Sequence, residues 1–373
     1  VTEPVPRSDF DGEVATGIFK TRLMLRPMAK MNAEIFYKVR DRDYDADRDG
    51  YLYVRGDGGD QPESKFTVYN TNHDLTSQVA GIEVDYRLPL RSKLSFKYEY
   101  EDVERRNAAV EETEEDRYTL GYRLQPWSNF SARMQLQYAD RAADTYEWAQ
   151  DYYALLDAEL INATPDNQRY NNHPELFQYY MANRERWEGK IDLSYLPGER
   201  WNLNLNLLWR DDDFDQSRLG LTESTWQRAH FSASYAASDT LAGSIYAGYD
   251  VYEGDQTSRA FRGGQEKNAF EVYPPLPQAS DPQQNWDLDA TDTSITLGAN
   301  LQWQLAPDLE LNLDYNYVDT TGEQDYSTRP GGTATASDLP DTDTRLHHVQ
   351  ASGTWQMQDN LSVQVDYQFY SYE

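Results

Sequence analysis

The sequence contains no cysteine among its 373 residues, and this absence excludes several kinds of site at once. Without cysteine there is no disulfide, no thiolate metal centre and no C-x-x-C-H motif for covalent attachment of a c-type haem. The sequence also lacks any run of about 18 or more apolar residues, which excludes a transmembrane helix. No G-x-S-x-G, H-E-x-x-H or phosphate-loop motif is present, so nothing in the sequence predicts an enzyme.

Basic residues are scarce relative to acidic ones. There are 34 Lys and Arg against 64 Asp and Glu, which gives a formal net charge of -30. Binding to nucleic acid phosphates requires patches of Lys and Arg, so this balance disfavours a nucleic-acid partner. The low mean hydropathy of -0.86 does not exclude a membrane protein. In a transmembrane β-barrel only alternate strand residues face lipid, and the others face water.

The feature that is present throughout is a repeated hairpin whose strands alternate strictly in polarity. In one strand the apolar residues Leu94, Phe96, Tyr98 and Tyr100 alternate with Lys93, Ser95, Lys97, Glu99 and Glu101. This period of two gives a strand one apolar face and one polar face. Seven such hairpins are expected, at about 15–40, 77–101, 117–139, 186–210, 225–251, 291–318 and 344–370.

Short turns within the hairpins and long acidic segments between them indicate the asymmetry of an outer-membrane barrel, with periplasmic turns and extracellular loops. We therefore predict an all-β fold, a transmembrane antiparallel up-and-down β-barrel with about fourteen strands, in a single domain over 1–373. A soluble sandwich or propeller is the alternative. Its strands usually run about 5 to 6 residues, whereas these run nearer ten.

Alternation also predicts which residues face lipid and which face the lumen. Aromatic residues toward the strand ends are expected to form two interfacial girdles. One girdle, near the short turns, contains Trp127, Trp201, Trp303 and Trp355, and the other contains Tyr100, Tyr138, Trp209, Tyr249, Tyr317 and Phe369. The predicted lumen-facing residues include Lys97, Glu99, Arg123, Arg133, Lys190, Asn204, Asn206, Glu310, Asp314 and Asp366.

One acidic segment has the spacing of a calcium loop. Asp45, Asp47 and Asp49 occupy positions 1, 3 and 5 of an EF-hand pattern and Gly50 occupies position 6. Position 12 is Gly56 in place of the bidentate Glu, and no helix pattern flanks the segment. The sequence leaves calcium binding open against a solvated acidic loop. No catalytic, cofactor or metal site is otherwise predicted, because the five histidines lack metal-ligand spacing.

Several segments together resemble the MtrB/PioB family of outer-membrane barrels that are associated with decahaem cytochromes. The first is 25–43, which reads LRPMAKMNAEIFYKVRDRD, and the others are 85–105, 111–116, 211–214 and 219–224. The resemblance implies a porin-like sheath in the bacterial outer membrane that houses a periplasmic multihaem c-type cytochrome. Such a sheath supports extracellular electron transfer, carries no cofactor of its own because the partner holds the haem, and offers its long loops to an extracellular multihaem cytochrome.

The chain departs from the family pattern in its missing cysteine pair and in its number of strands, which in the family is in the mid-twenties. It also opens on VTEPVP, with neither Met nor an apolar leader segment. We expect a piece of a larger barrel, although an even-stranded smaller barrel is also consistent with the sequence. A porin that passes small solutes through a water-filled lumen remains the alternative function.

Overall fold

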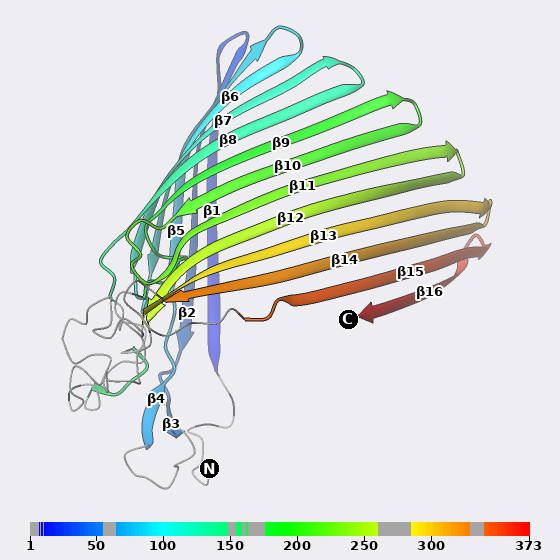
Figure 1. Cartoon of the computed structure of the whole chain (residues 1–373). Helices are drawn as coiled ribbons and strands as arrows, with labels where there is room; N and C mark the ends of the chain where they lie inside the picture. The colour runs from blue at the N-terminus through cyan, green and yellow to red at the C-terminus, as the bar shows by residue number, and fades with distance from the viewer. Residues whose placement is uncertain are drawn as a thin grey trace.

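A computed structural model describes residues 7, 9, 11–54, 65–147, 154–158, 162, 176–259, 285–328 and 339–373. Fourteen strands form one antiparallel sheet in which each strand pairs with its neighbours in the chain (Figure 1). They are β1 (Gly12–Met28), β2 (Met31–Ala46), β5 (Leu75–Leu88), β6 (Ser92–Arg105), β7 (Glu112–Trp127), β8 (Phe130–Ala143), β9 (Arg184–Gly198), β10 (Trp201–Asp213), β11 (Gly220–Ser238), β12 (Leu241–Arg259), β13 (Asn285–Ala306), β14 (Leu309–Thr328), β15 (Thr342–Gln358) and β16 (Leu361–Tyr372). The antiparallel up-and-down arrangement expected from the alternation is confirmed.

Short turns join the two strands of every hairpin and lie along one rim of the sheet. The turn after β5 places Leu90 and Arg91 at positive φ, and Ser92 Oγ donates to the Pro89 carbonyl at 2.7 Å. Pro126 lies inside β7, where the pairing with β8 shifts register between Leu124 and Trp127. Proline has no N–H for the ladder, so a bulge is where a strand accepts it.

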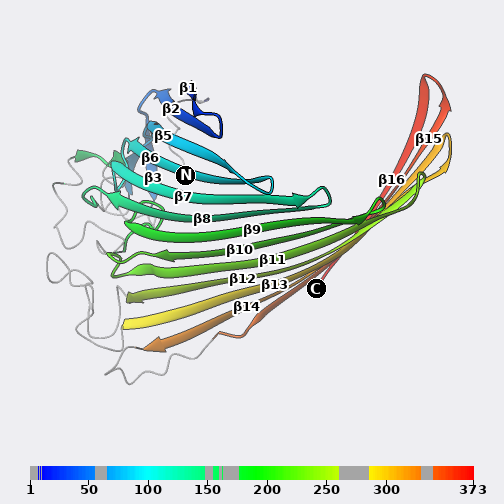
Figure 2. The ribbon, with the colours of Figure 1, turned by 90° about the horizontal axis from the view of Figure 1, so that it is seen from above.

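The sheet is curved and strongly twisted, and it is open. Strand direction rotates steadily from β1 to β16 (Figures 1 and 2), as expected from the right-handed twist of strands. Within the described residues no ladder joins β1 to β16, so each has one free edge. The fourteen strands therefore form a wall that does not close on itself.

A second, two-stranded sheet lies in the segment that follows β2. Strands β3 (Gly50–Val54) and β4 (Lys65–Tyr69) pair with each other, and Val68 forms an isolated bridge with Leu156. This small hairpin is not among the seven hairpins expected from the alternation. Each run of alternating residues in this segment is short. The two strands are separated by residues 55–64, which lie outside the described residues.

Most large apolar side chains lie on one exposed face of the sheet instead of in a central core. A small buried cluster of Ala109, Val110 and Met181 lies at the rim opposite the short turns. None of the described residues forms a helix long and apolar enough to span a membrane.

Candidate functional site: the two faces of the wall

The register of the ladders assigns every strand residue to one of two faces, because directly paired residues project on the same side of a sheet. On the apolar face Leu205 pairs with Phe231 and Leu193. On the polar face Asn204 pairs with Ser232 and Ser194. One face is thus continuous in apolar residues and the other in polar ones.

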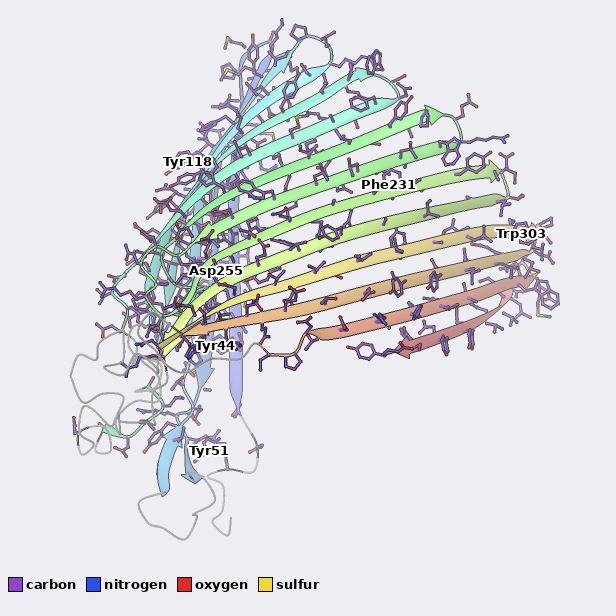
Figure 3. The ribbon with its side chains drawn as sticks, viewed as in Figure 1. Tyr44, Tyr51, Tyr118, Phe231, Asp255 and Trp303 are labelled. Atoms are coloured by element: carbon purple, nitrogen blue, oxygen red, sulfur yellow. The ribbon has the colours of Figure 1, made fainter. Side chains whose placement is uncertain are left out.

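The apolar face is exposed. Ile245 is 58% accessible and Val365 is 66% accessible, which is unusual for residues of this kind unless another apolar phase covers them. Tyr118, Phe231 and Trp303, labelled in Figure 3, belong to this face. All ten residues predicted to form girdles also lie here: Trp127, Trp201, Trp303 and Trp355 toward the short turns, and Tyr100, Tyr138, Trp209, Tyr249, Tyr317 and Phe369 toward the opposite rim. Their contact with lipid remains a prediction.

All ten residues predicted to face the lumen lie on the polar face: Lys97, Glu99, Arg123, Arg133, Lys190, Asn204, Asn206, Glu310, Asp314 and Asp366. Most contact a neighbour. Lys97 pairs with Glu99 at 2.7 Å, and Asn206 Nδ2 donates to Asp192 at 2.7 Å. Arg123 and Arg133 lie directly opposite each other on β7 and β8. The face is not uniformly polar, since Leu208 projects from it as well.

Ion pairs cross the polar face from β6 to β10. Arg184 on β9 reaches Glu115 on β7 at 2.8 Å, and Arg186 makes two hydrogen bonds to Asp212 on β10, at 2.5 and 2.8 Å. Further pairs join Arg117 to Glu101 and Glu115, Arg210 to Glu188, and Lys190 to Glu188. Glu188 and Asp212 are buried, so these carboxylates are neutralised by cations of the wall itself.

On β11 and β12 the same face carries a cluster of three residues. Arg228 Nε and His230 Nε2 both contact the carboxylate of Asp250, the latter at 3.0 Å. His230 also lies across Gly248, where a Cβ atom would approach its Nε2 to 2.8 Å. The glycine is therefore what allows the imidazole to lie flat on the wall.

Aromatic rings lie flat across glycines at two more places on the polar face. A Cβ added at Gly81 would collide with the ring of Phe36, and one added at Gly298 would collide with the ring of Tyr246. Each ring comes from the strand next to its glycine. Rings held in this way project less into the space above the wall than upright ones.

At the rim opposite the short turns, the segment just before β9 is held against the polar face. Arg141 on β8 donates from Nε, Nη1 and Nη2 to the carbonyls of Ala182, Tyr180 and Tyr179, at 2.8, 2.9 and 2.7 Å. Because Arg141 pairs with Glu115, its side chain is on the polar face. Residues 179–182 therefore lie over the polar face of the wall.

The candidate calcium segment is built differently from a calcium loop. Asp45 belongs to β2 and Gly50 opens β3, while Gly56 lies outside the described residues. Asp47 and Asp49 both pair with Arg7 at 2.8 Å, and the hydrogen bond that Arg7 donates to Asp47 raises the pKa of Arg7. In the described part of the chain no group of three or more His, Asp or Glu is arranged to hold a metal ion.

Sequence reasoning did not find the cross-strand ion pairs or the role of Arg141. Partners such as Glu115 and Arg184 are 69 residues apart, and only the strand register brings them together. It also did not place the basic residues of β1 and β2 on the polar face, because β1 alternates least regularly and carries Ile18 and Met24 on that face.

A family model described as "Putative outer membrane beta-barrel porin, MtrB/PioB" matches residues 2–373. The chain belongs to the MtrB/PioB family. Among curated relatives, "Outer membrane protein MtrB" of Shewanella baltica (strain OS185) is 22% identical over 308 residues, which cover 82% of this chain and 39% of that protein. The chain therefore spans about two fifths of the length of this MtrB relative. As an MtrB/PioB protein it is an outer-membrane, porin-like β-barrel protein.

Solved structures match the chain over most of its length, with low sequence identity and TM-scores below 0.5. The FrpB iron transporter from Neisseria meningitidis gives a TM-score of 0.43 with 10% identity, covering 97% of this chain and 61% of that one. "Copper transporter OprC" gives 0.39 with 10% identity, covering 100% of this chain and 64% of that one.

Proposed function

We propose that the sheet is part of the wall of an outer-membrane barrel that houses a multihaem c-type cytochrome against its polar face and so supports electron transfer across the outer membrane. In this proposal the chain binds no cofactor and carries out no chemistry. A periplasmic cytochrome inside the barrel carries the haem, and the rim opposite the short turns is where an extracellular multihaem cytochrome docks.

The observation that carries the proposal is the character of the polar face in a chain of this family. Its charges between β6 and β12 are largely neutralised within the wall, by pairs such as Arg186 with Asp212 and Arg228 with Asp250. Rings such as that of Tyr246 lie flat across glycines. Rings that lie flat leave room for a folded protein to approach the polar face closely. Charges that are already paired within the wall lose little when that protein displaces the water around them.

The size of the sheet fits a part of a larger wall. Barrels of 16 to 18 strands enclose an aqueous channel, and about 22 strands are needed before the lumen holds a plug of protein. Within a membrane the free edges of β1 and β16 have to be paired, because unsatisfied backbone groups in hydrocarbon cost several kcal/mol each. Further strands that pair with these edges would complete a barrel wide enough for a protein.

The test is to purify the full-length protein from outer membranes in mild detergent and reconstitute it in liposomes that contain a redox dye. We expect a haem-staining protein to co-purify, and the enclosed dye to respond to an external reductant only when both proteins are present. Conductance to small solutes without a haem-staining partner would contradict the proposal and favour the porin function.

A further inference from the structure

The hairpin formed by β1 and β2 carries a row of cations on the polar face, which we call the basic ladder: Arg22, Lys20, Lys38, Arg40 and Arg42. Lys20 on β1 lies directly opposite Lys38 on β2. Arg40 and Arg42 continue the row along β2 toward the rim opposite the short turns. Lys38, Arg40 and Arg42 belong to YKVRDRD, the end of the segment 25–43 that resembles the MtrB/PioB family.

Alternation separates the two signs of charge in this segment. Lys38, Arg40 and Arg42 are on the polar face, while Asp41 and Asp43 project from the opposite face of the same strand. The carboxylates nearest in sequence therefore cannot reach the cations. The neighbouring strands supply none either, since Val79, Ser77 and Leu75 of β5 are paired with Lys38, Arg40 and Arg42, and Ile18 and Thr16 of β1 are paired with Arg40 and Arg42.

The ladder is thus largely without internal compensation, whereas most cations on the polar face of β6 to β12 have a carboxylate partner. Arg22 pairs with Glu34 at 2.9 Å, and the guanidinium of Arg42 lies 4.6 Å from the centre of the Tyr44 ring. Lys20, Lys38 and Arg40 are exposed, and within the described ranges none of the three has an ion pair. On β6 to β12 the corresponding cations Arg117, Arg186, Arg210 and Arg228 each contact a carboxylate.

This difference is not explained by a shortage of acid, because the chain carries 64 Asp and Glu. Like charges directly opposite each other destabilise a sheet. A row of cations with Lys20 facing Lys38 is therefore a cost to the isolated wall, and it is relieved by a partner of opposite charge.

We propose that the basic ladder is a docking sector for a carboxylate-rich surface of the protein housed against the polar face. The inference rests on the proposed function and adds to it the place of contact and the charge of the partner surface. Complementary charge at this sector fixes the rotation of the partner inside the barrel and speeds its capture, since charge pairs set orientation and encounter rate.

The experiment compares full-length variants for the haem-staining protein that they retain during purification across a sodium chloride series. The test variant K38Q/R40Q lowers the charge of the ladder by two. The control K30Q/R91Q removes two positive charges from short turns at one end of the same part of the wall, and K38R/R40K keeps the charge of the ladder. Heat-modifiable gel mobility of each variant, made in cells without the partner, reports folding.

We expect K38Q/R40Q to fold and to retain about tenfold less haem protein at moderate salt, while both controls behave as the unchanged protein. Equal retention by K38Q/R40Q at every salt concentration would overturn the docking sector and leave the proposed function intact. Loss of folding by K38Q/R40Q without the partner would overturn it too, by assigning the ladder a structural role. Absence of any haem protein from the unchanged chain would overturn both proposals.

Discussion

Arg186 on β9 holds Asp212 on β10 in a two-point contact, with Nε to Oδ1 at 2.5 Å and Nη2 to Oδ2 at 2.8 Å. The Asp212 side chain is only 9% exposed, and Arg184 lies 3.8 Å from the same carboxylate. The pair links β9 to β10 through their side chains, in addition to the backbone hydrogen bonds of the ladder. It is one of several ion pairs between residues on neighbouring strands of the polar face.

Replacement of Asp212 by Ala is expected to destabilise the folded barrel by about 1–3 kcal/mol, because the partly buried guanidinium of Arg186 loses both of its hydrogen bonds to that carboxylate. A urea unfolding series on the protein in detergent micelles measures the change. Asp213→Ala is the control, since Asp213 is the next residue and projects from the other, exposed face. Similar unfolding midpoints for the two variants would contradict the role given to the Arg186 contact.

Neighbouring residues of β10 test the assignment of faces. Leu205→Arg places a charge on the apolar face and is expected to impair membrane assembly, at a cost of about 2–4 kcal/mol near the midplane. Asn204→Arg places the same charge on the polar face and is expected to assemble normally. Heat-modifiable gel mobility measures assembly, and equal mobility patterns for the two variants would show that the faces are assigned wrongly.

The packing of Tyr246 on Gly298 is tested by Gly298→Ala. The new Cβ displaces the Tyr246 ring, and with it the 3.3 Å hydrogen bond from Tyr246 Oη to Asn316, so we expect a loss of about 1 kcal/mol. Gly17→Ala is the matched control, because a Cβ at Gly17 meets nothing within 4 Å. In a double-mutant cycle, Tyr246→Ala should remove most of the cost of Gly298→Ala, and additive effects would argue against the contact.

The anchoring of residues 179–182 by Arg141 is tested by limited proteolysis and hydrogen exchange. Arg141→Ala removes three hydrogen bonds to main-chain carbonyls and is expected to raise cleavage and exchange in this segment several-fold. Arg133→Ala, on the same strand and face, is the control. Unchanged protection in Arg141→Ala would mean that the cluster around Met181 holds the segment without the arginine.

The sequence predicted the class of fold and the polarity of most strand residues because both follow from period-two alternation. Leu94, Phe96, Tyr98 and Tyr100 had to share a face whichever strands lay beside them. The contact between Arg186 and Asp212 was not predictable in the same way, since it depends on the register between two strands. The hairpin of β3 and β4 was missed because its strands are five residues each.

The basic ladder lies between these two cases. Alternation of Lys38, Arg40 and Arg42 with Asp41 and Asp43 is visible in the sequence, and it predicts opposite faces for the two signs. The pairing of β1 with β2 is needed to show that Lys20 joins the row. The pairing of β2 with β5 is needed to show that no carboxylate of β5 lies opposite Lys38, Arg40 or Arg42. Sequence pattern assigns a residue to a face, whereas register determines whether its charge is compensated.

The central claim, that a haem protein lies against the polar face, is tested most directly by photo-crosslinking from two adjacent positions of β10. A photoreactive residue is placed at Asn204 on the polar face or at Leu205 on the apolar face of the full-length protein in its own outer membrane. The account predicts a haem-staining crosslinked product from position 204 and none from position 205. Absence of that product from position 204 in assembled protein, together with conductance to small solutes, would contradict it.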